Sequence, residues 1–272
     1  MISYQIGTIR YQIKSWKFPA GEVGCQIQAH SAAQKVDEVR IVASIQSSDE
    51  LMQLFMVTDA LRRQFYNARI ELWLGYTPYG RQDRVCNDGE SLSLAVFASL
   101  INAQNYSRVV VLDPHSDVTP ALLNKCTVNS LRDIFISMTG ERYNQHVFVA
   151  PDAGAAKKVG SIAEYFGCDV VYGVKKRNMV DGKIVSLDLS GDVEGKRVIV
   201  VDDIADGCAT FLQLGEVLKE KGVRTADLFV THGIFSKGTG ALANLYQNIY
   251  TTNSYHQDRE EIVDGVFYFR YF

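Results

Sequence analysis

The sequence predicts an α/β protein built from two similar domains, each a mainly parallel sheet flanked by helices. Short apolar runs rich in β-branched residues alternate with longer amphipathic stretches along the chain, as in strand–helix units. Several of these runs are continuously apolar, which is typical of parallel strands buried on both faces. In each half, one such run leads into an aspartate-containing loop, Asp113-Pro114-His115 in the first and Asp202-Asp203 in the second.

The predicted strands are apolar segments bounded by polar or turn-forming residues. Because parallel strands need long crossover connections, we expect a helix or a long loop after most of them. In chain order the strands are Val39–Ile45, Ile70–Leu74, Val109–Leu112, Val147–Ala150, Val170–Tyr172, Val198–Val201 and Leu228–Thr231.

Helices are predicted in the connections between these strands. Their apolar residues recur at three- and four-residue spacing, so that one face of each helix can pack on a sheet. The segments are Asp49–Phe65, Ser91–Asn102, Ala155–Tyr165 and Thr210–Lys221. The last ends at Gly222 after two lysines, a pattern typical of a helix C-terminus.

A break in this alternation around Gly140 predicts the domain boundary. We expect an N-terminal domain over residues 1–138 and a C-terminal domain over residues 139–254. The tail, residues 255–272, ends in the aromatic, strand-like segment Val266–Phe272. We expect this segment to return to the sheet of the first domain.

Composition narrows the functional classes. The 272 residues include 28 Lys and Arg against 31 Asp and Glu, a net charge of −3, which argues against a large nucleic-acid-binding surface. No apolar run approaches the roughly 20 residues of a membrane span, and the N-terminus lacks the apolar core of a signal peptide. The five cysteines are scattered without a C-x-x-C pair, so we expect a cytoplasmic protein with neither a zinc site nor a disulfide framework.

The most informative segment follows the predicted strand Val198–Val201. Adjacent carboxylates lead into a loop of small residues and then a helix, with the residues Asp202, Asp203, Asp206, Gly207, Cys208, Ala209 and Thr210. Backbone N–H groups at a helix start form an anion-binding cradle, and carboxylates bind sugar hydroxyls or a magnesium ion. The segment therefore predicts a site for a ribose that bears a phosphate. The alternative is an ordinary strand–turn–helix with solvated aspartates.

This segment, VIVVDDIADGCAT, resembles the ribose-phosphate loop of type I phosphoribosyltransferase folds, so both domains are expected to be type I phosphoribosyltransferase-like. Further segments in collinear order resemble motifs of the ribose-phosphate pyrophosphokinase family, also called phosphoribosyl pyrophosphate synthetases. They are Phe18–Glu22, Asp59–Arg63, Tyr79–Arg84, Asp113–His115, Pro151–Gly154, Val174–Arg177 and Thr231–Ser236.

The resemblance implies transfer of the β,γ-diphosphate of ATP to the anomeric hydroxyl of ribose 5-phosphate, with AMP as the leaving group. It implies Mg²⁺ as cofactor, ATP and a ribose phosphate as small-molecule partners, and a homo-oligomer. No nucleic-acid or membrane partner is expected.

The resemblance also implies roles for individual residues. Lys175 and Arg177, in a segment flanked by Gly173 and Gly182, would stabilise negative charge on the transferring phosphate. His115 would belong to the catalytic magnesium–ATP site. Asp152 would face the ribose or its metal, so His115 and Asp152 are the metal candidates. ATP is assigned to Phe18, Glu22, Arg81, Gln82, Asp83 and His115, the first two completing the site of a neighbouring subunit.

Two departures from the family pattern open an alternative substrate. Gly207 stands where the family has a threonine whose hydroxyl helps to hold a terminal 5′-phosphate, and Ala209 stands where it has a glycine. The chain resembles a divergent, phage-like branch for which the acceptor would be ADP-ribose, in NAD salvage; a phage-encoded protein would act in the host cytoplasm. Less favoured alternatives are a phosphoribosyltransferase and a non-catalytic regulatory homologue.

Overall fold

The computed structural model describes residues 1–30, 35–177, 184–256, 261–263 and 265–271, with side chains described for all of these except 175–177, 184–186 and 261–263. The chain divides into two compact units between Asn129 and Ser130. The expected boundary after residue 138 is therefore nine residues late. Helix α4 (Leu131–Thr139) belongs to the second unit because the ring of its Phe135 packs within that unit against Phe148 and Phe229.

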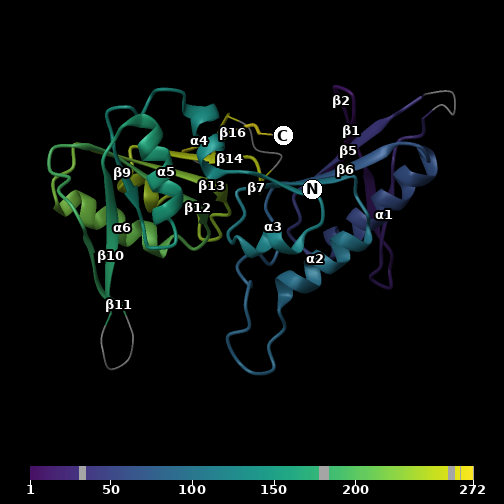
Figure 1. Ribbon diagram of the computed structural model, residues 1–272, viewed down its shortest axis with the longest axis horizontal. Helices are drawn as coiled ribbons and strands as arrows, with labels where there is room; N and C mark the ends of the chain where they lie inside the picture. The colour runs from purple at the N-terminus through teal and green to yellow at the C-terminus, as the bar shows by residue number, and fades with distance from the viewer. Residues whose placement is uncertain (31–34, 178–183, 257–260, 264, 272) are drawn as a thin grey trace. The chain divides into compact units, whose positions relative to one another are not determined.

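The first unit contains a six-stranded sheet in the order β2-β1-β5-β6-β7-β8 (Figure 1). The four strands from β5 to β8 are parallel, whereas β1 and β2 pair antiparallel at one edge. A separate hairpin is formed by β3 (Lys14–Lys17) and β4 (Val23–Gln26). The strands of the sheet are β1 (Ile2–Ile6), β2 (Ile9–Gln12), β5 (Glu38–Ala43), β6 (Arg69–Leu74), β7 (Arg108–Leu112) and β8 (Cys126–Asn129).

Three helices connect the parallel strands: α1 (Ser48–Gln64), α2 (Ser93–Ala103) and α3 (Val118–Leu122). Helix α1 begins where the Ser47 side chain accepts a hydrogen bond from the Glu50 N–H, a capping signature readable in the sequence. Its fully buried Leu54 and Leu61 belong to the same core as the sheet residue Leu72. This packing anchors the sheet whose carboxyl edge carries the predicted nucleotide loops.

The second unit contains an eight-stranded sheet in the order β11-β10-β9-β12-β13-β14-β16-β15. The six inner strands are parallel, and the edge strands β11 and β15 are antiparallel to their neighbours. The strands are β9 (Val147–Ala150), β10 (Val170–Arg177), β11 (Ile184–Leu189), β12 (Arg197–Ala205), β13 (Thr225–Gly233), β14 (Asn248–Thr252), β15 (Glu261–Val263) and β16 (Val266–Phe269).

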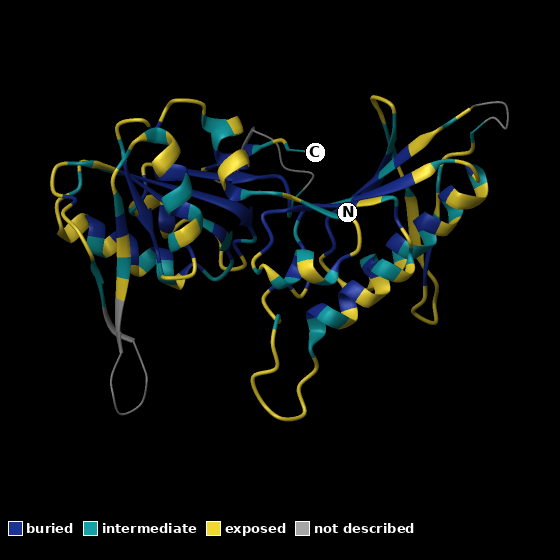
Figure 2. Cartoon of the chain, in the orientation of Figure 1, coloured by how far each residue is buried: buried dark blue, intermediate teal, exposed yellow. Residues whose placement is uncertain are grey.

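Both faces of this second sheet are covered, which explains its continuously apolar strands. Besides α4, the unit holds α5 (Ala156–Phe166), α6 (Ala209–Glu220) and a short 3₁₀ helix, η1 (Leu242–Asn244). Phe211 of α6 belongs to the core on one face, and Phe166 of α5 packs with the ring of Phe135 on the other. Strands β9, β12 and β13 are accordingly dark blue along most of their length in Figure 2.

The C-terminal segment differs from the expectation. Strand β16 pairs in parallel with β14 of the second unit instead of returning to the first sheet. The Tyr250 ring stacks on the rings of Phe267 and Phe269, and Val266 is fully buried in the second core. The aromatic residues thus give the tail a partner within the second unit. In the described part of the chain, no helix has the length and apolar character needed to cross a membrane.

Candidate active site

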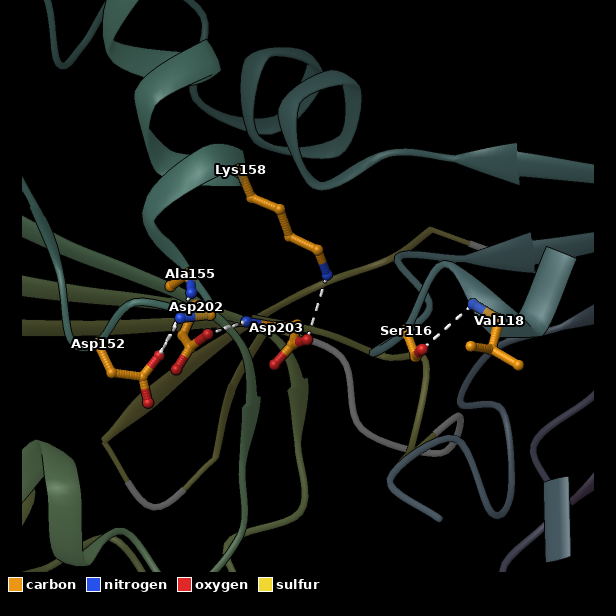
Figure 3. Close-up of polar contacts among 8 residues, drawn as sticks. Ser116, Val118, Asp152, Ala155, Lys158, Asp202 and Asp203 are labelled. Carbon is orange, nitrogen blue, oxygen red and sulfur yellow. Dashed lines mark hydrogen bonds and ion pairs between the residues drawn. The ribbon is translucent and has the colours of Figure 1, made fainter. Parts of the chain in front are cut away.

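The carboxyl end of β12 presents the two adjacent carboxylates predicted from the sequence. Asp203 is buried, with Lys158 Nζ of α5 3.2 Å from its Oδ2 atom (Figure 3). The N–H of Asp203 donates to Oδ1 of Asp202 over 2.9 Å, and this bond orients the Asp202 carboxylate. The Lys158 cation offsets part of the repulsion between the two neighbouring carboxylates. Sequence reasoning missed Lys158; its signal is a basic residue in the first turn of the helix that follows Asp152.

Asp152 lies at the same edge of the sheet, because β9 is the parallel neighbour of β12. Its Oδ1 accepts hydrogen bonds from the N–H groups of Gly154, over 2.9 Å, and Ala155, over 3.3 Å (Figure 3). This turn leads directly into α5 and fixes the carboxylate at the carboxyl ends of the strands, where ligands of α/β sheets bind. The predicted Asp152, Asp202 and Asp203 are therefore brought to one edge.

The loop from Asp206 to Thr210 has the features of an anion cradle. Cys208 adopts a left-handed conformation with φ of 60°, and α6 starts at the next residue. The side chain of its N-cap residue, Cys208, makes no capping hydrogen bond, whereas Ser47 and Ser130 cap α1 and α4 with their side chains. The first N–H groups of α6 lie at the carboxyl edge of the sheet, where helix starts of this kind bind phosphate.

The Cys208 side chain faces the core, so this residue would contribute to the cradle through its backbone. It is 7% exposed and belongs to the second hydrophobic core. Burial and the nearby Asp206 raise the pKa of the Cys208 thiol to about 11, which keeps it protonated near neutral pH. A nucleophilic role for this thiol is thus disfavoured. Thr210 is half-buried, and Ala209 is exposed at the helix start.

The segment after β13 runs along this loop and holds it. The N–H groups of Ile234 and Phe235 both donate to the Ala205 carbonyl, over 2.8 and 3.0 Å, and Ser236 N–H donates to the Asp206 carbonyl over 3.2 Å. The segment Thr231–Ser236 was predicted as a family motif from the sequence, but no role was assigned to it. The structure shows that its backbone supports the residues before the cradle.

The position of Gly207 is open. A Cβ atom built there would meet only Lys237 Cε, at 3.9 Å, among the described residues. The backbone of Gly207 also lies outside the left-handed region, so a Cβ atom would add no backbone strain there. Glycine at this position consequently leaves space in the loop without being required by the fold.

The predicted catalytic cations lie on the hairpin of β10 and β11. The backbone of Lys175 pairs with Leu187 and that of Arg177 with Ile184, with a register shift between Lys176 and Arg177. Their side chains lie outside those that the structure describes. The catalytic assignment of both residues stays a prediction.

In the first unit, the predicted nucleotide loops follow β6 and β7 and meet each other. The Asp83 carboxylate accepts hydrogen bonds from Arg84 Nε, over 2.9 Å, and from Ser116 in the loop after β7. These bonds, the one from Arg84 first, lower the pKa of Asp83 to about 2. A Cβ atom at Gly80 would lie 3.8 Å from Cβ of His115, so the two loops pack closely.

Side chains suited to a polyphosphate remain exposed on these loops, namely those of Arg81, Gln82 and His115. The Asp83 carboxylate, by contrast, accepts hydrogen bonds from Arg84 and Ser116, so it links the two loops to each other. Tyr79 and Asp113, with φ of 61° and 33°, adopt left-handed backbone conformations in the same loops. Strained non-glycine residues of this kind often accompany functional sites.

Phe18 and Glu22 lie at the turn that joins β3 and β4. The turn is closed by a 2.7 Å hydrogen bond from Phe18 N–H to the Glu22 carbonyl, and the Phe18 side chain is 49% exposed. The ring of Trp16 lies edge-on to that of Phe18, with centroids 6.0 Å apart. This second exposed aromatic residue was not predicted. Together the rings offer an apolar surface suited to a base.

The chain was compared with known protein families. The model of the N-terminal domain of ribose phosphate pyrophosphokinase matches residues 1–104, and the phosphoribosyl transferase domain model matches residues 127–258. The two matches fall largely within the first and second structural units, respectively.

Ribose-phosphate pyrophosphokinase of Campylobacter jejuni is 30% identical over 222 residues, which cover 81% of this chain and 71% of that protein. The enzyme of the same name from Aquifex aeolicus is 32% identical over 225 residues, covering 80% of this chain and 70% of that protein. The crystal structure of phosphoribosylpyrophosphate synthetase from Mycobacterium smegmatis has the same fold, with a TM-score of 0.79, 23% identity and coverage of 96% and 86% of the two chains. The family models match both halves of the chain, and its motifs occur in the order of the family. The chain therefore belongs to the ribose-phosphate pyrophosphokinase family.

Proposed function

We propose that this protein transfers the β,γ-diphosphate of ATP to the anomeric hydroxyl of ribose 5-phosphate, giving phosphoribosyl pyrophosphate and AMP. The observation that carries the proposal is the edge of the second sheet, where paired carboxylates stand beside the start of α6, whose N-cap residue Cys208 makes no capping hydrogen bond through its side chain. Such an arrangement supplies acceptors for sugar hydroxyls and donors for a phosphate within a single loop.

The acceptor sugar would be held by Asp202 and Asp203, and its 5′-phosphate by N–H groups of the loop at Gly207–Thr210. Lys158 keeps Asp203 in place and balances its charge. In the reaction the anomeric oxygen forms a bond to the β-phosphorus, the bond from that phosphorus to the α,β-bridging oxygen breaks, and the hydroxyl proton is released. Holding the sugar rigidly favours this attack because the reacting atoms need alignment more than covalent assistance.

Lys175 and Arg177 would stabilise the negative charge that develops on the transferring diphosphate and on AMP. A lysine and an arginine two positions apart in the same strand would supply a point charge and a planar fork for phosphate oxygens. Removal of one such charge-stabilising group reduces the rate by roughly 10²–10³.

Magnesium fits the chemistry of the second-unit edge. Asp152, Asp202 and Asp203 offer oxygen atoms, which Mg²⁺ prefers, and Mg²⁺ on ATP is bound by one or two carboxylates together with phosphate oxygens. When bound, the ion would neutralise part of the polyphosphate charge. His115 offers nitrogen and would act through a bound water molecule. Among the described residues, no group of three or more His, Cys, Asp or Glu forms a preassembled metal site, consistent with an ion that arrives with its nucleotide.

ATP would be bound by the exposed Arg81, Gln82 and His115 of the first unit. Phe18 and Glu22 would complete the ATP site of a second copy of the chain, since an exposed aromatic residue and a carboxylate at a hairpin turn can bind a base. We therefore propose a homo-oligomer. A fully active monomer in light scattering coupled to an activity assay would contradict this assignment.

ADP-ribose is the second candidate acceptor, and the open position at Gly207 favours it. A phosphate that is joined to a further group has one fewer ionisable oxygen and needs space beyond it, which Gly207 provides. The Gly207→Thr variant restores a hydroxyl donor at a position where a Cβ atom meets only Lys237 Cε, at 3.9 Å, among the described residues. We expect the kcat/KM for ribose 5-phosphate to rise relative to the kcat/KM for ADP-ribose in this variant. An unchanged ratio would mean that this position does not select the acceptor.

The enzyme is tested by AMP release from ATP–Mg²⁺ with ribose 5-phosphate and ADP-ribose in parallel reactions. Absence of AMP with either acceptor would refute both candidates. The Asp202→Asn and Asp203→Asn variants should weaken acceptor binding in calorimetry more than ATP binding, because each bond from a hydroxyl to a charged group contributes about 1.5–3 kcal/mol. Glu216→Gln, which makes the same change at an exposed position of α6, is the control. Equal losses for both substrates would refute the division of roles.

A further inference from the structure

Lys237 is a cation beside the predicted phosphate loop that the proposed reaction leaves without a role. It lies in the turn after β13, where Gly238 N–H donates to the Phe235 carbonyl over 2.9 Å and Gly238 is left-handed. The residues before this turn are held by three hydrogen bonds to the Ala205 and Asp206 carbonyls. The backbone that carries Lys237 is therefore fixed relative to the loop.

The turn is also anchored by packing. Phe235 is 7% exposed although its backbone is left-handed, with φ of 50°. Its ring lies so close to Gly233 that a Cβ atom there would be 2.3 Å from Phe235 Cε2. A strained backbone held by a buried ring indicates a defined turn, because an unsupported left-handed residue would relax.

The side chain of Lys237 reaches the open position in the loop. Its Cε atom, which carries the ammonium nitrogen, is 3.9 Å from where a Cβ atom at Gly207 would stand. Lys237 is exposed and forms no ion pair with any carboxylate among the residues that the structure describes. An ammonium on a fixed turn beside a small residue can bind a phosphate with little rearrangement.

The position of Lys237 distinguishes the first phosphate of an acceptor from a second one. The N–H groups of the α6 start belong to Ala209 and the residues after it, whereas Lys237 lies beside Gly207, before the cap residue Cys208. A terminal phosphate seated on the helix start already has its donors. A second phosphate joined to the first would extend through the open space at Gly207 toward the ammonium.

We infer that Lys237 forms a subsite for a second phosphate on the acceptor, so that it favours a pyrophosphate-linked ribose over ribose 5-phosphate. The inference rests on the proposed diphosphate transfer and names the residue that would select between its two acceptors. The first phosphate loses one negative charge when it is joined to a second group, which weakens its binding. The contact between the second phosphate and the Lys237 ammonium would make up for that loss.

The test compares Lys237→Met, which keeps most of the apolar stem and removes the charge, with Lys237→Arg, which keeps the charge. Lys219→Met, at an exposed lysine near the C-terminal end of α6, is the control. The kcat and KM for ribose 5-phosphate and ADP-ribose are measured with ATP–Mg²⁺ at low and high salt. Calorimetry of ADP-ribose binding gives a readout that does not depend on turnover.

We expect Lys237→Met to lower kcat/KM for ADP-ribose about 10- to 100-fold, mainly through KM, the loss for one charge-assisted hydrogen bond. Ribose 5-phosphate should change by less than about 3-fold, Lys237→Arg should restore most of the loss, and the loss should shrink at high salt. Equal losses for both acceptors would overturn the inference, since Lys237 would then contact the terminal phosphate.

The failure of this inference is separable from failure of the proposed function. A wild-type protein that uses ribose 5-phosphate and neither binds nor uses ADP-ribose would overturn the role of Lys237 and leave the transfer reaction intact. A protein that releases AMP with neither acceptor would refute the proposed function. In that case calorimetry still decides the subsite: ADP-ribose binding that Lys237→Met weakens would support it, and unchanged or absent binding would overturn it.

Discussion

Gly173 connects the fold of the second unit to the proposed acceptor site. It lies in β10, one residue beyond the last pair between β10 and β9, beside the end of β9. A Cβ atom at this position would be 2.5 Å from the Pro151 carbonyl oxygen and 3.1 Å from its carbon, both of them backbone atoms. The residue after that carbonyl is Asp152. We predict that Gly173→Ala impairs both stability and catalysis.

The size of the effect follows from the distance. Ordinary van der Waals contact begins at 3.4 Å, so a methyl group 2.5 Å from the oxygen requires the two backbones to separate by about 0.9 Å. Inserting a methyl group into a packed site costs about 1–3 kcal/mol of unfolding free energy. A displacement of about 1 Å in substrate-positioning groups costs on the order of 100-fold in rate. We expect kcat/KM for the acceptor to fall 10- to 100-fold, with the ATP KM less affected.

Urea denaturation and steady-state kinetics of purified variants would check this prediction. Gly160→Ala is the matched control, because it adds the same methyl group to the interior of α5, where nothing lies within 4 Å. We expect it to preserve activity and to raise stability by up to about 1 kcal/mol. A Gly173→Ala protein with wild-type stability and kcat/KM would refute the reasoning. Lost stability with unchanged kcat/KM would show that β10 moves instead of the Asp152 turn.

Three further predictions concern other parts of the chain. Lys175→Ala and Arg177→Ala should each lower kcat by roughly 10²–10³ with little change in melting temperature, and near-normal turnover of both variants would contradict their catalytic role. Tyr143→Phe removes the 3.0 Å hydrogen bond from the Tyr143 hydroxyl to the buried Asp227 and should lower unfolding free energy by about 1.5–3 kcal/mol; an unchanged urea midpoint would disprove this. The pKa of Asp83 is lowered to about 2 by the adjacent guanidinium, so its stabilisation is present above the unfolded pKa of about 3.9 and is lost as pH falls toward 2. The urea midpoints of wild type and Asp83→Asn should therefore differ at pH 7 and converge as pH falls from about 4 toward 2, and a gap that persists at pH 2 would exclude this linkage.

The sequence by itself was sufficient for the local features of this protein. Strands β5, β6, β7, β9, β12 and β13 were predicted within a few residues, since apolar composition and periodicity act over short distances. The loop after β12 was predicted as well, because a buried strand, two carboxylates and small residues before a helix form a local pattern. The short strands β2 and β8, at the two edges of the first sheet, were missed, because few residues and partial exposure leave little periodic signal.

Only the tertiary structure decided which distant segments meet. The ion pair of Lys158 with Asp203 joins residues 45 positions apart, and nothing in the local sequence of either residue specifies the other. The tail pairs with β14 and not with the first sheet, because an exposed strand edge accepts any suitable segment and packing of Tyr250 selects among them. Likewise, Lys237 comes to lie beside Gly207 through parallel pairing of β12 with β13, which aligns the loops at their carboxyl ends. Local propensity determines the elements of this protein, whereas pairing and packing across the chain determine which charges stand together at the site.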